Sequence, residues 1–241
     1  RWNCLFTLLA NGRVAGARHY ATAMASQGML VIPSMVGLAL RRTGMDPSAP
    51  IPDPAAVLAR PGPPAGLVDP ALLAAGMVAA FQSRPALVDS VTRVLADSVA
   101  ARTAEGDTLS ARIIAGLGEG VEGHRAMAEG REEAALRLLE RSHAMVAGGG
   151  GPESSFLSHV AWSLAELYSR ADRHREALRY LESLGQSLFA APALLRRADL
   201  HERLGETDRA VDLRRAFLAM WSGADPDHPM VREARRGLPP G

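Results

Sequence analysis

The chain has 241 residues, and its 27 Arg+Lys against 26 Asp+Glu leave a formal net charge of +1. None of the basic residues is lysine, which excludes a phosphate-binding loop of the GxxxxGK[ST] type and any Schiff base on lysine. The balanced charge argues against a dedicated nucleic-acid binder, and no apolar run reaches the roughly 20 residues of a membrane-spanning helix. We therefore expect neither nucleic-acid binding nor membrane insertion within this segment.

Composition favours helices. Alanine, the best helix former, occurs 43 times, whereas aromatic residues make up only 5% of the chain. The single cysteine, Cys4, excludes an intrachain disulfide and a thiolate metal cluster, and we expect a cytoplasmic location. Because the chain begins with Arg1 rather than methionine, we expect it to be a segment of a longer protein.

The first part of the chain predicts a helical unit followed by a linker. Apolar residues at helical spacing indicate helices over about 1–11, 13–27 and 33–43, so residues 1–45 are expected to form a helical hairpin unit, which could be a degenerate repeat. Eight of the 16 prolines then fall between Pro47 and Pro70. Since proline removes a donor and biases its predecessor away from helix, residues 46–69 are expected to be a linker.

The rest of the chain, residues 70–241, predicts a succession of helices. Asp69 is expected to cap a helix that Pro70 opens, Pro85 to open a second that runs to about Ala104, and Asp107 to cap a third. No segment shows the sustained alternation of a strand, so the fold class is all-α. Further helices are expected at about 131–146, 154–170, 173–188, 192–204, 207–221 and 229–237, with a mobile loop at Gly148–Gly151.

An internal repeat is the strongest signal. An offset of 33 residues carries Leu167 onto Leu200 and Arg170 onto Arg203, and each copy reads as a helix, a short polar turn and a second helix. A looser pattern, a turn residue followed five positions later by alanine, recurs along the chain. Its five occurrences are Gly12/Ala17, Gly106/Ala111, Gly130/Ala135, Asp172/Ala177 and Gly205/Ala210.

The repeat resembles the tetratricopeptide repeat, whose pattern is matched by Leu164, Ala165, Tyr168 and Ala177. The resemblance implies a solenoid of helical hairpins over 70–241, with the best repeats at 158–190 and 191–223 and a C-terminal cap at 224–238. The ending from Phe217 to Pro226 resembles those of tetratricopeptide regions attached to bacterial serine/threonine kinases and signalling regulators. The function it implies is a non-catalytic protein-interaction scaffold that takes a protein or peptide partner and needs no cofactor or metal.

In this family the first helix of each hairpin lines a concave binding surface. Trp162 is the residue we expect to anchor a partner, because an aromatic side chain on a polar surface is a typical binding anchor; the alternative is packing against the neighbouring repeat. The resemblance places nine residues on the concave surface: His159, Trp162, Glu166, Ser169, Arg170, Leu195, Asp199, Glu202 and Arg203.

Two alternatives to the scaffold stay open. The repeats could instead space or dimerise an upstream catalytic domain, since the apolar ends of a solenoid favour self-association. A nucleotide-binding enzyme is suggested by Gly118–Gly123, which matches GxGxxG but lacks a clear strand before it and an unbroken helix after it. We expect this stretch to be a glycine-rich bend between two helices, and we expect no catalytic residues in the chain.

Overall fold

The structure is a computed structural model that describes residues 2–59, 67–147 and 152–239. These residues form thirteen helices and no strand, which confirms the all-α class. None of the described helices combines the length and the apolarity needed to cross a bilayer. The helices are α1 (Trp2–Ala10), α2 (Val14–Ser26), α3 (Val31–Thr43), α4 (Pro54–Leu58), α5 (Pro70–Phe81), α6 (Pro85–Ala104), α7 (Thr108–Ala128), α8 (Glu132–Val146), α9 (Pro152–Arg170), α10 (His174–Glu182), α11 (Ala190–Arg203), α12 (Thr207–Met220) and α13 (Pro229–Arg236).

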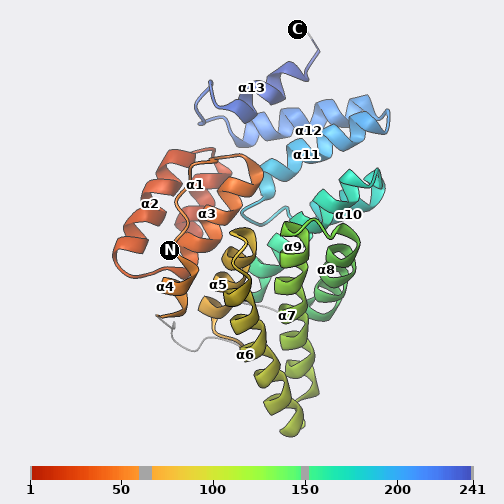
Figure 1. The fold of residues 1–241 in the computed structure, drawn as a ribbon. Coiled ribbons are helices and arrows are strands. Elements are labelled where there is room, and N and C mark those ends of the chain that lie inside the picture. Colours follow the sequence, from red (N-terminus) through yellow and green to blue (C-terminus); the bar gives the residue numbers. More distant parts are fainter. Residues whose placement is uncertain (1, 60–66, 148–151, 240–241) are drawn as a thin grey trace.

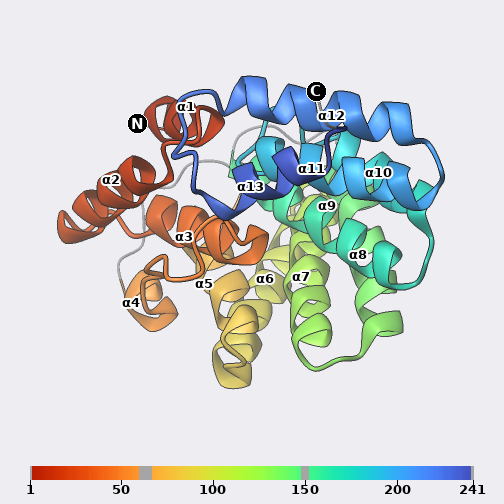
Figure 2. The same ribbon diagram turned by 90° about the horizontal axis from the view of Figure 1, so that it is seen from above.

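Helices α5 to α9 stand side by side, and α11 to α13 lie across one end of this row (Figure 1). The N-terminal helices α1 to α3 pack back onto the other elements, so that the N-terminal and C-terminal regions of the chain are in contact (Figure 2). The turn at Gly12 lies against Trp221 and Ala224, and the Nε2 atom of His228 is 3.1 Å from the carbonyl oxygen of Met45. One continuous apolar core therefore runs from α1 to α13.

Six helical hairpins are closed by the same turn. In each, one residue adopts a positive φ between 54° and 77°, and the next residue donates its N–H to the carbonyl five positions earlier at 2.8–2.9 Å. This is the bonding of a Schellman motif, which satisfies a free carbonyl at the helix end. The left-handed residues are Gly12, Ser83, Gly106, Gly130, Asp172 and Gly205.

The residue five positions after each turn is buried, as the repeated turn–alanine spacing predicts. A small side chain there lets the second helix approach the first closely. All five turn–alanine pairs in the sequence follow this geometry. In the sixth turn the left-handed residue is Ser83 and the buried residue five positions later is Val88. The turn–alanine pattern read from the sequence does not include this pair, because it requires glycine or aspartate followed by alanine.

The segment Gly118–Gly123 is not a bend, contrary to our expectation, because it lies inside the unbroken helix α7. Three glycines of α7, at positions 116, 120 and 123, serve close packing instead. A Cβ atom at Gly116 would lie 2.7 Å from that of Met145, one at Gly120 would lie 2.5 Å from the ring of Phe156, and one at Gly123 would lie 2.7 Å from Leu139. We call this contact between α7 and the helices α8 and α9 the glycine seam.

Two other segments differ from expectation. Residues 46–59 of the expected linker fold onto the core, where Ala49 and Val57 are fully buried and Asp53 caps α4 by accepting from the Ala55 N–H at 3.1 Å. Helix α10 ends at Glu182 rather than near 188, and the turns that follow bring Phe189 into the core. The glycine run at 148–151 and residues 60–66 lie outside the described part of the chain.

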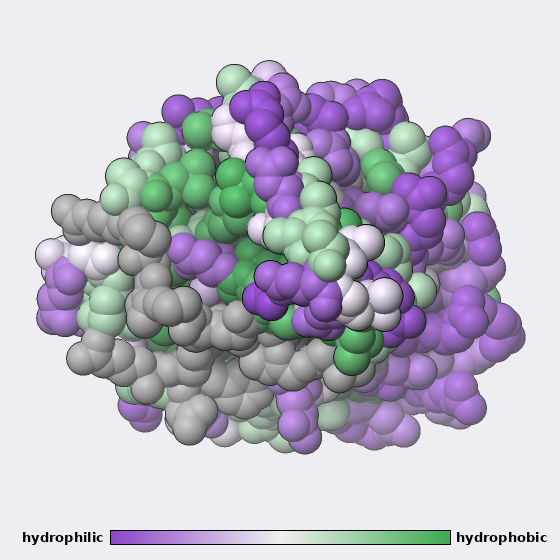
Figure 3. All heavy atoms as spheres, turned by 90° about the horizontal axis from the view of Figure 1, so that it is seen from below, coloured by the Kyte–Doolittle hydropathy of each residue, from purple (hydrophilic) through white to green (hydrophobic). Residues whose placement is uncertain are grey.

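Polar side chains cover much of the surface. The face that carries the lower ends of α5 to α9 in Figure 1 has apolar side chains near its centre and hydrophilic ones around its rim (Figure 3). Within the described residues, only Phe81, Val94 and Leu109 are large apolar side chains classed as exposed.

Candidate functional site

The helix that carries most of the predicted concave residues, α9, is partly covered by α3. Arg42, at the end of α3, donates through Nη2 to Glu166 Oε2 at 2.7 Å and to Ser163 Oγ at 2.8 Å. Its side chain is only 7% exposed, against 20% for Glu166. We call this group the arginine bridge; it occupies part of the surface that the sequence assigns to a partner.

Ser163 also lies 3.0 Å from Nε2 of His124 on α7, whose Nδ1 is 2.6 Å from the carbonyl oxygen of Gly120. Because a carbonyl can only accept, Nδ1 carries the proton and Nε2 is left as an acceptor. Burial, helped by the nearby charge of Arg42, lowers the pKa of His124 to about 3. A serine beside a histidine can form a nucleophile and its base, but an imidazole with this pKa is a weak base and Ser163 is fully buried. The contact instead joins α7 and α9 beneath the arginine bridge.

His159 is fully buried too, which removes it from the surface on which we expected it. Its ring packs edge-on against Phe189 with 4.8 Å between ring centroids. Burial, with the charge of Arg42, holds the pKa of His159 well below its usual value. His159 therefore acts as a neutral packing residue in this structure.

Trp162 is 1% exposed and stacks on Phe189 with 5.2 Å between centroids. Its Nε1 has no hydrogen-bond partner within the described residues. Trp162 is therefore placed as a packing residue rather than as a surface anchor. The turns between α10 and α11 bring Phe189 against the indole ring. Trp162 still forms part of the wall of the hollow described next.

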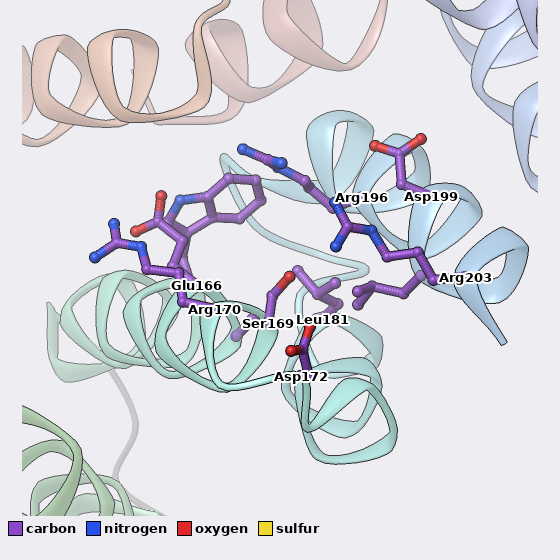
Figure 4. A pocket seen from close by; sticks show the side chains of 11 residues that line it. Glu166, Ser169, Arg170, Asp172, Leu181, Arg196, Asp199 and Arg203 are labelled. Atoms are coloured by element: carbon purple, nitrogen blue, oxygen red, sulfur yellow. The ribbon is translucent and has the colours of Figure 1, made fainter. Parts of the chain in front are cut away.

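A hollow of about 340 Å³ lies between α9, α10 and α11 (Figure 4). We call it the α9–α11 groove. Arg196 and Arg203 reach over it from α11, opposite Glu166, Ser169 and Arg170 on α9 (Figure 4). Six of the nine predicted residues line it: Trp162, Glu166, Ser169, Arg170, Asp199 and Arg203.

Two of the three acidic side chains of the α9–α11 groove are matched by arginines from outside it, and the third, Asp172, is exposed and pairs with no arginine in the part of the chain that the structure describes. Glu166 pairs with Arg42, and Asp199 pairs with Arg214 at 3.3 Å. Within the described residues, Arg196 and Arg203 form no ion pair. Burial and the nearby Glu233 raise the pKa of Asp199, while Arg214 and Arg196 oppose the rise. The arrangement leaves positive charge free to meet a ligand.

The other two predicted residues on α11 do not line this groove. Leu195 is 4% exposed and borders a separate hollow of about 220 Å³ that reaches Met230 on α13. Glu202 accepts two hydrogen bonds from Arg214, at 3.0 and 2.7 Å, and so ties α11 to α12. The sequence does not indicate this placement of Glu202, because no local pattern shows that Arg214 is buried between these helices.

Sequence reasoning did not single out Arg196 or Arg42 for the site. Arg196 stands where the 33-residue offset places Ser163, so the repeat alignment could have identified it as facing the same surface. Arg42 was recognisable only as one of a pair of adjacent arginines. Its partners lie 121 and 124 residues further along the chain, and no local pattern indicates them.

The described residues do not provide the geometry of a dinucleotide-binding or a metal-binding site. Gly118–Gly123 lies within a helix and is not preceded by a strand, so it lacks the strand–turn–helix arrangement of dinucleotide binding. No group of three or more His, Cys, Asp or Glu in the described ranges is placed to hold a metal ion. Comparison with protein families finds none that matches the chain, and a search among curated proteins finds no match either.

Proposed function

We propose that this chain is a protein-interaction module built from tetratricopeptide-like hairpins, and that its α9–α11 groove takes a peptide segment of a partner protein. The observation that carries the proposal is the groove itself, because residues chosen from the repeat pattern gather there from both copies of the repeat. The six matching hairpin turns support the repeat interpretation. Side chains from successive repeats that face one hollow are the usual basis of peptide recognition by helical repeats.

The charges of the groove favour an acidic segment. Arg196 and Arg203 are exposed and make no ion pair in the described chain, and Arg170 pairs with Glu132 only at the surface, where both side chains are about half exposed. Guanidinium groups bind carboxylates through two parallel hydrogen bonds. Leu181, Leu200 and Ala165 supply apolar wall between these charges.

The test is selection from a random peptide display library with the whole chain. We expect enrichment of acidic peptides, and about a tenfold loss of affinity in an Arg196→Ser, Arg203→Ser double variant. Arg93→Ser is the matched control, because Arg93 is also exposed and makes no ion pair, but lies on α6 away from the groove. Failure to enrich any peptide, or equal binding by the double variant, would contradict the proposal.

We further propose that the module belongs to a larger bacterial signalling or regulatory protein of the cytoplasm. The support is the C-terminal resemblance: Phe217 and Trp221 pack together in the core with 4.8 Å between centroids, as expected of a structural capping element. Co-purification of the full-length parent with a partner that requires the groove arginines would test this. A parent protein that lacks any signalling or regulatory domain would overturn it.

A further inference from the structure

A second hollow lies on the other side of the arginine bridge. It measures about 440 Å³ and is formed by α3, α5, α7 and α9. Glu166 and Arg170 border both this hollow and the α9–α11 groove, so the two are neighbours along α9. We call it the α3–α9 pocket. None of the residues predicted from the sequence to bind a partner, apart from these two, belongs to it.

Part of the wall of the α3–α9 pocket is apolar. Leu38, Met77 and Met127 line it, and methionine side chains adapt readily to the shape of a bound apolar group. Phe81, at the end of α5, is 42% exposed here. An exposed aromatic ring beside a hollow gains a large apolar contact when a ligand covers it.

The charge around this apolar wall is positive. Arg41 forms no ion pair within the described residues; its Nε donates to the Ala49 carbonyl at 2.6 Å, which leaves both Nη groups available. Arg42 and Arg170 also border the pocket, against a single acid, Glu166, which Arg42 already neutralises. Arg41 therefore offers unpaired guanidinium donors next to an apolar surface, and Arg170 is engaged only by a half-exposed ion pair with Glu132.

We infer that the α3–α9 pocket binds an internal acidic segment of a partner protein through one large apolar side chain. That side chain rests on Leu38, Met77 and Met127 beside Phe81, and neighbouring carboxylates pair with Arg41 and Arg170. Charge complementarity selects acidic residues, and the apolar wall selects leucine or phenylalanine between them. The inference rests on the proposed function, since the same segment would continue past the shared Glu166 and Arg170 into the α9–α11 groove.

The probe is a fluorescein-labelled, end-blocked peptide with a central leucine flanked on each side by two aspartates. Its anisotropy is measured against the whole chain at low and at physiological salt. We expect saturable binding that weakens at least about tenfold when the aspartates become asparagines, or when the leucine becomes alanine. Phe81→Ser and Arg41→Gln should each weaken binding of the parent peptide to a similar extent.

Two exposed residues serve as controls. Leu109→Ser removes an apolar side chain that is 60% exposed but does not line the pocket. Arg93→Ser removes an exposed arginine of α6 that does not line it either. Both should bind within about twofold of the unchanged chain, and thermal melts should show that every variant is folded. If binding depends on Arg196 and Arg203 but not on Phe81 and Arg41, the inference is overturned while the proposed function stands. Absence of binding, or equal binding of the asparagine peptide, also overturns it, and the library selection then decides the proposed function separately.

Discussion

Helix α9 is held by two contacts of opposite chemistry. At the glycine seam, α7 has no side chain at Gly116, Gly120 and Gly123, and apolar groups of α8 and α9 fill the space. At the arginine bridge, a buried guanidinium from α3 meets a carboxylate, a hydroxyl and, through that hydroxyl, a neutral histidine. The first contact depends on volume and the second on charge and hydrogen bonding, so they should fail under different perturbations.

The largest expected effect is at the glycine seam. Phe156 is 1% exposed and its ring lies against Gly120, so Phe156→Ala empties a core site that α7 cannot fill. We expect a loss of about 3–5 kcal/mol in the free energy of unfolding, measured by urea denaturation of the whole chain. Leu109→Ala, at a side chain that is 60% exposed, should change it by less than about 0.5 kcal/mol. Similar losses for the two variants would contradict the packing described for the seam.

The arginine bridge should respond to loss of one charge. Arg42→Met leaves the Glu166 carboxylate and the Ser163 hydroxyl without their donor, and we expect a loss of about 3 kcal/mol by the same measurement, the low end for breaking a buried pair because Glu166 is 20% exposed. Removing both charges, in Arg42→Met with Glu166→Met, should restore most of that stability. The control is Arg18→Met: Arg18 pairs with Asp46 at 3.3 Å but is 46% exposed, and its loss should matter by less than about 1 kcal/mol.

Acid should destabilise the fold through two buried histidines near the arginine bridge, one of which, His124, also packs edge-on against Phe156 of the glycine seam. The pKa values of His124 and His159 lie below their value of 6.5 in the unfolded chain, mainly because both rings are buried. Below pH 6.5 the unfolded chain therefore binds more protons than the folded one, and stability falls as the pH falls. Between pH 7.5 and 6.0 we expect the two histidines together to remove about 1.5 kcal/mol from the free energy of unfolding.

Variants assign this pH dependence. His124→Asn should remove about half of it, whereas His19→Asn, at an exposed position, should leave it in place. A stability that is flat between pH 7.5 and 6.0 in the unchanged chain would show that the two rings are not buried as neutral groups.

The two contacts also mark what the sequence can predict. Helix starts were readable because their signals are local: Asp69 accepts from the Ala71 N–H at 2.8 Å and Asp107 from the Ser110 N–H at 3.1 Å, as their positions before the helices indicate. Five of the six hairpin turns followed from residue type in the same way, since glycine and aspartate tolerate a positive φ; the sixth, at Ser83, did not.

Tertiary contacts overrode local signals elsewhere. A run of glycines is typical of a bend, but inside α7 the missing side chains are compensated by close packing of α8 and α9. The contact of α3 with α9 could not be predicted from the sequence, because Arg42 bonds residues that lie more than 120 positions further along the chain. For the candidate site, the family resemblance placed six lining residues but could not show that Phe189 and α3 bury Trp162 and His159.

The smallest expected effect compares two glycines of the same helix. A Cβ atom at Gly118 would meet only Leu95, at 3.9 Å, so Gly118→Ala should raise the free energy of unfolding by about 0.5–1 kcal/mol through helix propensity. A Cβ atom at Gly120 would lie 2.5 Å from the ring of Phe156 and 2.6 Å from the hydroxyl of Ser142. Gly120→Ala should therefore lower stability by about 1 kcal/mol after the same propensity gain is counted.

The size of the Gly120 effect should depend on Phe156. In the Phe156→Ala background the obstructing ring is gone and only the Ser142 hydroxyl remains close, so Gly120→Ala should lose most of its cost, while Gly118→Ala keeps its gain in both backgrounds. Urea denaturation of the four variants and the two parents measures this coupling directly. Should Gly120→Ala stabilise the unchanged chain as much as Gly118→Ala does, α7 and α9 can separate without penalty. Close packing of α7 against α9 would then not explain why glycine occupies this position.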